Sequence, residues 1–158
     1  MFFNFCINNS INRLNDYPSI LTSQLLILLI FYYRTRYNAG IFLLLRSYLN
    51  IPAGSSKVHG DVNCIVPKTI HPFAFRTHAH QWGTVIRGYK YTTNTNEMEE
   101  IAAGNPQWPQ QFYPIKKQVT VNHGDYLVAR CTFNNSAGDR DIHIGKVILI
   151  TNLIIIYK

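Results

Sequence analysis

The pattern best suited to chemistry is the pentapeptide RTHAH, which sits in a run of residues typical of a β-strand. Side chains alternate between the two faces of a strand, so Arg76, His78 and His80 are expected on one face. At a rise of about 3.4 Å per residue, the two imidazoles lie about 7 Å apart along the strand and can converge on one metal ion. The guanidinium beside them could hold a carboxylate through two parallel hydrogen bonds. An arginine that simply pairs with Asp139 or Asp141 is the alternative.

Two imidazoles do not complete a metal site, because a mononuclear site usually takes at least three protein donors. The candidate third ligands in the chain are His59, His71, His123, His143 and Met98. Regular strand geometry would put His71 on the opposite face from the pair. His123 falls in an expected turn, and Met98 falls among glutamates in an expected polar loop. The residue pattern alone therefore predicts a metal-binding pair without a third donor, and two solvated histidines on a strand remain the alternative.

These residues need strands to position them, and most of the chain has that texture. From residue 39 onward, short runs rich in Val, Ile, Phe, Tyr and Thr alternate with turn residues, and none keeps a helical period for three turns. The strand-like runs are 40–45, 57–66, 71–91, 117–121 and 126–133, and residues 146–158 also fit a strand. Short strands joined by turns predict an all-β fold, an antiparallel β-sandwich resembling a jelly roll. Phe73 and Phe75, opposite the histidines, are expected in its core.

Length and composition agree with one domain that has two unusual ends. The chain has 158 residues, of which 47% are hydrophobic and 15% are charged. That charged fraction is below the roughly 25% usual in soluble domains. We divide the chain into a hydrophobic flank (1–37), a sandwich domain (38–145) and an Ile-rich tail (146–158). The flank contains an apolar stretch at 20–33 that could form a hydrophobic helix. It falls short of a ~30 Å bilayer core, so membrane contact is left open.

A formal net charge of +7 raises the question of a nucleic-acid partner. The basic residues are scattered, and the closest groupings are Arg34 with Arg36 and Lys116 with Lys117. Neither grouping forms a basic stripe with interleaved aromatic residues, so no nucleic-acid partner is predicted. The sequence also lacks a glycine-rich phosphate loop and any clear Ser/His/Asp or Cys/His arrangement for nucleophilic catalysis.

Four segments together resemble one enzyme family. In order they are HPFAFRTHAHQWGTVIRGYK (71–90), GNPQWPQQFYPI (104–115), HGDYLVARCTFN (123–134) and DIHIG (141–145). They resemble the second half of the catalytic core of the copper type II, ascorbate-dependent monooxygenases, in particular the peptidylglycine α-hydroxylating branch. The resemblance implies two sandwich domains with one copper each. The first would relay electrons from ascorbate. The second would bind O2 and hydroxylate the α carbon of a C-terminal glycine, the first step of peptide amidation.

The resemblance also implies roles for individual residues. His78 and His80 would be the imidazole ligands of the oxygen-binding copper, and Arg76 would hold the terminal carboxylate of a glycine-extended peptide. The implied cofactor is copper, with ascorbate as the reductant and O2 as the co-substrate. Cys64 and Cys131 match family cysteines that pair with partners beyond residue 145, and a disulfide between these two is the alternative in this chain.

The chain departs from the family after DIHIG. There the family places a methionine ligand, a cysteine, and an Asn and a Tyr that contact substrate, whereas KVILITNLIIIYK contains neither Met nor Cys. The family's electron-relay domain has no counterpart in residues 1–37. We therefore expect a chain that binds copper weakly and is inactive alone. A non-enzymatic copper- or peptide-binding sandwich is the alternative.

The resemblance implies a protein of the secretory pathway or the extracellular space, with membrane association left open. Two glycosylation sequons agree with that setting: Asn134-Asn135-Ser136 in an expected turn, and Asn8-Asn9-Ser10 in the flank.

Overall fold

The computed structural model describes residues 4–10, 39–46, 48–144 and 151–158. In these ranges the regular structure is entirely β-strand, and every strand pairing is antiparallel. The prediction of an all-β antiparallel sandwich is confirmed. Over the same ranges, no helix is long and apolar enough to span a membrane. The apolar stretch 20–33, where the sequence could form a hydrophobic helix, lies outside the described residues.

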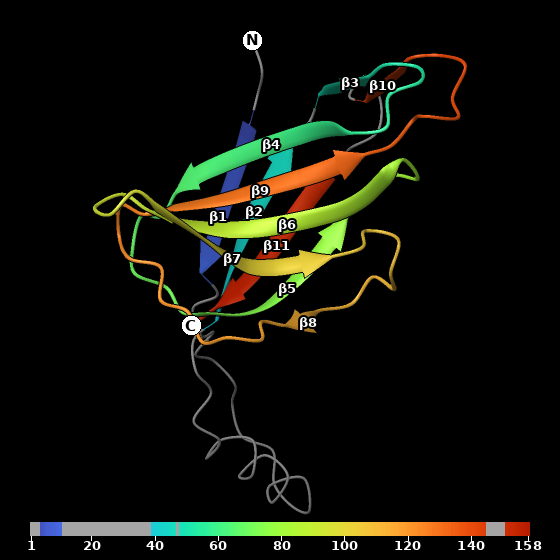
Figure 1. Cartoon of the computed structure of the whole chain (residues 1–158). Coiled ribbons are helices and arrows are strands. Elements are labelled where there is room, and N and C mark those ends of the chain that lie inside the picture. The colour runs from blue at the N-terminus through green and yellow to red at the C-terminus, as the bar shows by residue number, and fades with distance from the viewer. Residues whose placement is uncertain (1–3, 11–38, 47, 145–150) are drawn as a thin grey trace, which may run out of the picture.

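Two layers of strands make up the fold (Figure 1). The strands are β1 (Asn4–Ser10), β2 (Gly40–Arg46), β3 (Leu49–Ile51), β4 (Val58–Ile65), β5 (Pro72–His78), β6 (Gly83–Thr92), β7 (Glu97–Gly104), β8 (Tyr113–Pro114), β9 (Tyr126–Phe133), β10 (Ile142–Ile144) and β11 (Thr151–Tyr157). The front sheet in Figure 1 has the order β4-β9-β6-β7, and the rear sheet has the order β1-β2-β11-β5-β8. The short strands β3 and β10 pair with each other at one corner.

The core fills the space between the two layers and follows the alternation of each strand. On β9 the buried positions are Leu127, Ala129, Cys131 and Phe133, and the residues between them are more exposed. Each large apolar side chain removed from water in this way contributes about 1.5–3 kcal/mol. The layers approach closely at Gly88 on β6, where an added Cβ would lie 2.5 Å from Cδ2 of Leu153 on β11. A larger residue at Gly88 would therefore require the Leu153 side chain to move.

Most expected strands are present, with four differences. The run 71–91 is not continuous, because β5 ends at His78 and β6 begins at Gly83 after a turn that leaves His80 outside both strands. The run 117–121 is not a strand and contributes only an isolated bridge between Val121 and Ile70. Met98 belongs to the edge strand β7 and not to a polar loop. Phe73 is 41% exposed, whereas Phe75 is buried as expected. Alternation determines which face of the sheet a side chain occupies, but burial also requires another element to cover that face. The ring of Phe73 is not covered in this way, and the Lys158 ammonium lies 6.0 Å from its centroid.

The Ile-rich tail contributes a central strand. β11 lies between β2 and β5 in the rear sheet and pairs with both. Its alternate residues Leu153, Ile155 and Tyr157 are among the most buried in the described part of the chain, at 1%, 0% and 2% exposure. β1 from the flank likewise pairs with β2. The end of the family resemblance at residue 145 is therefore not an end of the sheet.

The outer face of the front sheet carries an ion pair whose effect depends on pH. Arg130 on β9 donates to both carboxylate oxygens of Asp61 on β4, at 2.8 and 2.7 Å. This hydrogen bonding lowers the pKa of Asp61 despite the opposing effect of burial. A carboxyl with a depressed pKa in the fold stabilises it above the ordinary pKa near 4, and that stability is lost as the pH falls through the folded value.

We therefore expect Arg130→Met to raise the pKa of Asp61 toward its ordinary range. Because the two side chains are 48% and 44% exposed, the loss of stability at neutral pH should stay below about 1 kcal/mol. An NMR titration of the Asp61 carboxyl, with urea unfolding at pH 7 and pH 3, measures both effects. The variant and the parent should converge in stability at the lower pH, and an unchanged Asp61 pKa would contradict the assignment.

Candidate metal and carboxylate site

Arg76 and His78 lie on β5, and His80 follows shortly after that strand ends. All three side chains are half-buried. The rings of His78 and His80 are 5.6 Å apart between centroids, with their planes at 68°. The structure thus brings together the two imidazoles that the strand spacing predicts on one face. Arg76, two residues before His78, lies on the same face of β5.

An apolar neighbour borders this site on the rear sheet. In the antiparallel register of β11 with β5, Ile154 lies opposite Arg76, and directly opposed residues share a face. Leu43 on β2 lies opposite Ile154 in turn, so a half-buried aliphatic row runs beside the guanidinium. The surface next to the guanidinium is therefore apolar on the side of β11 and β2.

Gln110 orients the guanidinium of Arg76. Its Oε1 accepts hydrogen bonds from Nε and Nη2 of Arg76, at 3.1 and 2.9 Å. Its Nε2 donates to the carbonyl oxygens of Thr77 and Pro106, both at 3.3 Å. Because the amide is neutral, it fixes the guanidinium without cancelling the positive charge. The alternative pairing of Arg76 with Asp139 or Asp141 does not occur among the described residues.

A second glutamine holds the backbone around His80. Nε2 of Gln107 donates to the carbonyl oxygens of Ala79, His80 and Gly83, at 3.3, 3.0 and 3.3 Å. The amide N of Gly83 also donates to the His80 carbonyl at 2.8 Å, which closes the turn between β5 and β6. Gly83 must be small here, because an added Cβ would lie 2.6 Å from Cβ of Ala79.

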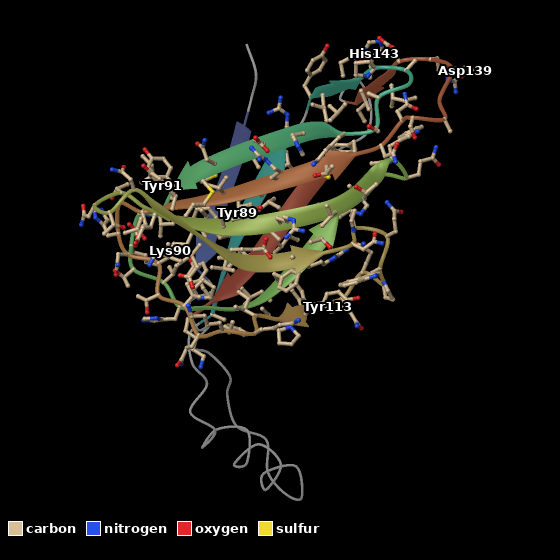
Figure 2. The ribbon with its side chains drawn as sticks, viewed as in Figure 1. Tyr89, Lys90, Tyr91, Tyr113, Asp139 and His143 are labelled. Atoms are coloured by element: carbon tan, nitrogen blue, oxygen red, sulfur yellow. The ribbon has the colours of Figure 1, made fainter. Side chains whose placement is uncertain are left out.

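Both glutamines belong to the loop between β7 and β8, and aromatic side chains anchor that loop. The rings of Trp108 and Tyr113 are 5.5 Å apart, and Tyr113 lies 6.0 Å from Phe75 on β5. Tyr113 also donates its hydroxyl to the Pro109 carbonyl at 3.0 Å, and Figure 2 shows it on β8 at the edge of the sheet. These rings line a mainly apolar pocket of about 330 Å³. The loop is thereby held against the edge of the rear sheet.

The electrostatic setting favours neutral imidazole at His78. Burial lowers the pKa of His78, and the nearby His80 and Arg76 lower it further, while a hydrogen bond with Gln110 acts in the opposite direction. Neutral imidazole is the form that coordinates a metal ion. His78 is therefore suited to act as a ligand.

The other candidate ligands lie away from this pair. His59 is on β4, His71 comes just before β5, His123 is in the turn before β9, Met98 is on β7, and His143 is on β10, at the corner shown in Figure 2. His59 and His71 each lie 3.2 Å from a threonine hydroxyl. In the described part of the chain, no three or more His, Cys, Asp or Glu side chains gather closely enough to hold a metal ion. His78 and His80 therefore offer two imidazole ligands, and imidazole is a ligand type that copper accepts readily.

The two cysteines of the front sheet do not pair with each other. Cys131 is a buried thiol outside any disulfide. In the register of β4 with β9, Cys131 lies opposite Gly60, whereas Cys64 lies opposite Leu127. An offset of four residues is about 13 Å along a strand, beyond the roughly 7 Å limit between Cα atoms for a disulfide. The alternative of a Cys64–Cys131 bridge is therefore wrong.

Sequence reasoning missed Gln107 and Gln110. Glutamine does not titrate and is not a usual metal ligand, so a search for chemically reactive residues passes over it. Both residues lie within the turn-rich segment GNPQWPQQFYPI, and a segment with that many turn residues beside a candidate site is the signal that could have indicated them.

Comparisons with known proteins bear on the family to which the chain belongs. Residues 37–149 match the sequence profile of the copper type II ascorbate-dependent monooxygenase, C-terminal domain. The chain is 36% identical over 108 residues to peptidyl-glycine alpha-amidating monooxygenase A of Xenopus laevis, and 37% identical over 108 residues to peptidylglycine alpha-amidating monooxygenase of Rattus norvegicus. Each match covers 68% of this chain and 11% of the relative, so the chain corresponds to a small part of those proteins.

A solved structure of infectious bursal disease virus, Gx strain, covers 90% of this chain and 42% of its own, with a TM-score of 0.34 and 8% identity, too low to bear on function. The profile match, in contrast, covers well over half of the chain and includes the RTHAH strand and the loop that carries both glutamines. The chain therefore belongs to the copper type II ascorbate-dependent monooxygenase family and corresponds to its C-terminal domain.

Proposed function

We propose that His78 and His80 bind copper, and that Arg76 binds the terminal carboxylate of a glycine-extended peptide. In this proposal the domain serves the hydroxylation of the α carbon of that glycine, with O2 as co-substrate and ascorbate as reductant. The observation that carries it is the placement of two adjacent imidazoles and an oriented, uncancelled guanidinium around one end of β5. Copper held there would supply the redox chemistry with O2.

The geometry explains why a carboxylate clamp suits this reaction. The α carbon of a C-terminal glycine is bonded directly to the carboxylate carbon. Arg76 and His78 are two residues apart on the same face of β5, about 7 Å along the strand. A carboxylate held by Arg76 would therefore place the α carbon beside the imidazole pair. Positioning a reacting atom in this way lowers the entropic part of a barrier.

We further propose that this chain binds copper weakly and does not turn over alone, in a secretory or extracellular setting. The support for weak binding is the donor set of two imidazoles without a third His, Cys, Asp or Glu nearby in the described ranges. The same observation favours the second candidate function, a copper- or peptide-binding sandwich without catalysis. Both candidates require the same side chains to bind, and they differ only in turnover.

Two measurements on the full chain test these proposals. Titration with Cu(I) against a coloured chelator, with ascorbate present and oxygen excluded, should show one weak site. An oxygen-dependent assay with a glycine-extended peptide, read by mass spectrometry for α-hydroxyglycine, should show no product above a copper-only control. Failure to bind copper would overturn the site assignment, and steady product formation would overturn the proposed inactivity and exclude the purely binding role.

The role of Gln110 gives a separate prediction. Gln110→Ala removes both hydrogen bonds that orient Arg76, worth about 1 kcal/mol, and should weaken binding of a glycine-extended peptide by about fivefold. Gln110→Glu should weaken it more, since a carboxylate pairs with Arg76 and competes with that of the peptide. Fluorescence anisotropy with a labelled peptide gives both affinities. An amidated peptide, which has no terminal carboxylate, is the control. Equal effects on both peptides would contradict the role of Gln110.

A further inference from the structure

The sequon Asn134-Asn135-Ser136 begins directly after β9. Asn134 is exposed, and its backbone N donates to the Trp82 carbonyl at 2.9 Å. Its Oδ1 accepts a hydrogen bond from the backbone N of Ser136 at 2.9 Å, which forms an Asx turn. Within the described ranges no hydrogen bond involves Nδ2 of Asn134, the atom that would carry a sugar.

The neighbouring asparagine fixes the turn in which Asn134 sits. Asn135 is only 5% exposed, and its Nδ2 donates to the carbonyl oxygens of Ile51, Pro52 and Arg140, at 3.4, 3.2 and 3.0 Å. An added Cβ at Gly138 would collide with the Asn135 side chain, so this loop packs tightly around it. Asn135 therefore holds this turn in place, and the turn leaves Asn134 exposed.

A shallow pocket opens beside the Asn134 side chain. Its volume is about 490 Å³, and it is lined by Gln81, Trp82, Thr84 and residues 134–138. The lining combines Trp82, which packs in part against the core, with amide and hydroxyl groups that can form hydrogen bonds. That combination suits a pyranose ring, which has one apolar face and polar substituents at its edge.

We propose that Asn134 carries an N-linked glycan, and that its first N-acetylglucosamine lies in this pocket against Trp82. In the transfer, Nδ2 of Asn134 forms a bond to C1 of a sugar, the bond from C1 to the diphosphate of a lipid-linked oligosaccharide breaks, and the amide proton leaves to a base. This proposal rests on the secretory setting proposed above. Transfer occurs before folding, and the exposed position lets the folded domain retain the glycan.

The test uses the full chain behind a heterologous signal peptide, secreted from cells that make only high-mannose glycans. Ser136→Thr keeps the sequon and Ser136→Ala destroys it while leaving both asparagines in place, so this pair separates glycosylation from folding. Asn8→Gln removes the second sequon, in β1. In the Asn8→Gln background we expect one glycan with Ser136 or with Ser136→Thr, and a loss of the corresponding mobility shift with Ser136→Ala. A secreted parent without sugar on Asn134 would overturn the proposal.

The position of the first sugar is tested through Trp82. The chain has two tryptophans, so Trp108→Phe leaves Trp82 as the only tryptophan emitter. One enzyme that trims the glycan to a single N-acetylglucosamine and another that removes it entirely give two matched samples. We expect acrylamide to quench Trp82 less in the trimmed sample. Equal quenching would overturn the contact with Trp82. Copper binding is measured separately on the glycosylated chain with both tryptophans in place, because Trp108 helps to anchor the loop beside the site, so failure of the glycan proposal is distinguishable from failure of the proposed function.

Discussion

Copper binding is expected to be lost when His78 and His80 are both replaced with alanine, while the sandwich stays folded. The affinity for Cu(I) should fall by roughly a hundredfold or more, because each lost imidazole removes a bond worth more than the ~1.4 kcal/mol that corresponds to tenfold. Both side chains are half-buried at one end of β5 and not within the core between the sheets. Competition with a coloured chelator measures the affinity, and thermal unfolding without metal shows whether the fold survives.

The matched control is the double variant His59→Ala and His123→Ala. These histidines are exposed, on β4 and in the turn before β9, and neither joins a group of three or more metal-binding side chains in the described ranges. The control should bind copper as the parent does. The site assignment is wrong if the control loses copper, or if the folded His78/His80 variant keeps the parent's affinity.

The site could be predicted from the sequence only where it depends on local geometry. Arg76 and His78 lie on one strand, so alternation is enough to place them on one face, and His80 follows two residues later in the turn after β5. Gln107 and Gln110 are about 30 residues further along, and their contacts depend on how the β7–β8 loop folds back over β5. Nothing in the local pattern contains that information. The residues that could coordinate or carry charge were predictable, and those that orient them were not.

The fold shows the same division. The alternation of apolar residues predicts both ends of β9 correctly, because the inward-facing residues of this strand pack against the opposite sheet along its whole length. β7 was missed because glutamates occupy the start of this edge strand, and only Ile101 and Ala102 are buried apolar residues in it. The tail fits a strand by pattern alone. Its place between β2 and β5 is a choice of pairing partners that the period of a single strand does not encode.

The central place of β11 gives the second large prediction. Ile155 is fully buried and lies in register with Phe42 on β2 and Phe75 on β5, both of which are also buried. Ile155→Ala removes apolar contacts to both neighbouring strands and leaves a cavity, so the free energy of unfolding should fall by about 2–5 kcal/mol. Domains of this size are stable by about 5–15 kcal/mol, so the loss is a large share of the total. Urea unfolding followed by circular dichroism measures it.

The adjacent residue supplies the control, since Ile156 on the outer face of β11 is only half-buried. Ile156→Ala makes the same chemical change at a site with less area to lose and no enclosed cavity to create, so it should cost distinctly less than Ile155→Ala. Equal small losses in both variants would contradict the burial of β11 between the sheets.

Because β11 also pairs with the segment of β5 that carries Arg76 and His78, a folded Ile155→Ala chain should bind copper less tightly as well. Stability and metal affinity would then fall together at this one strand.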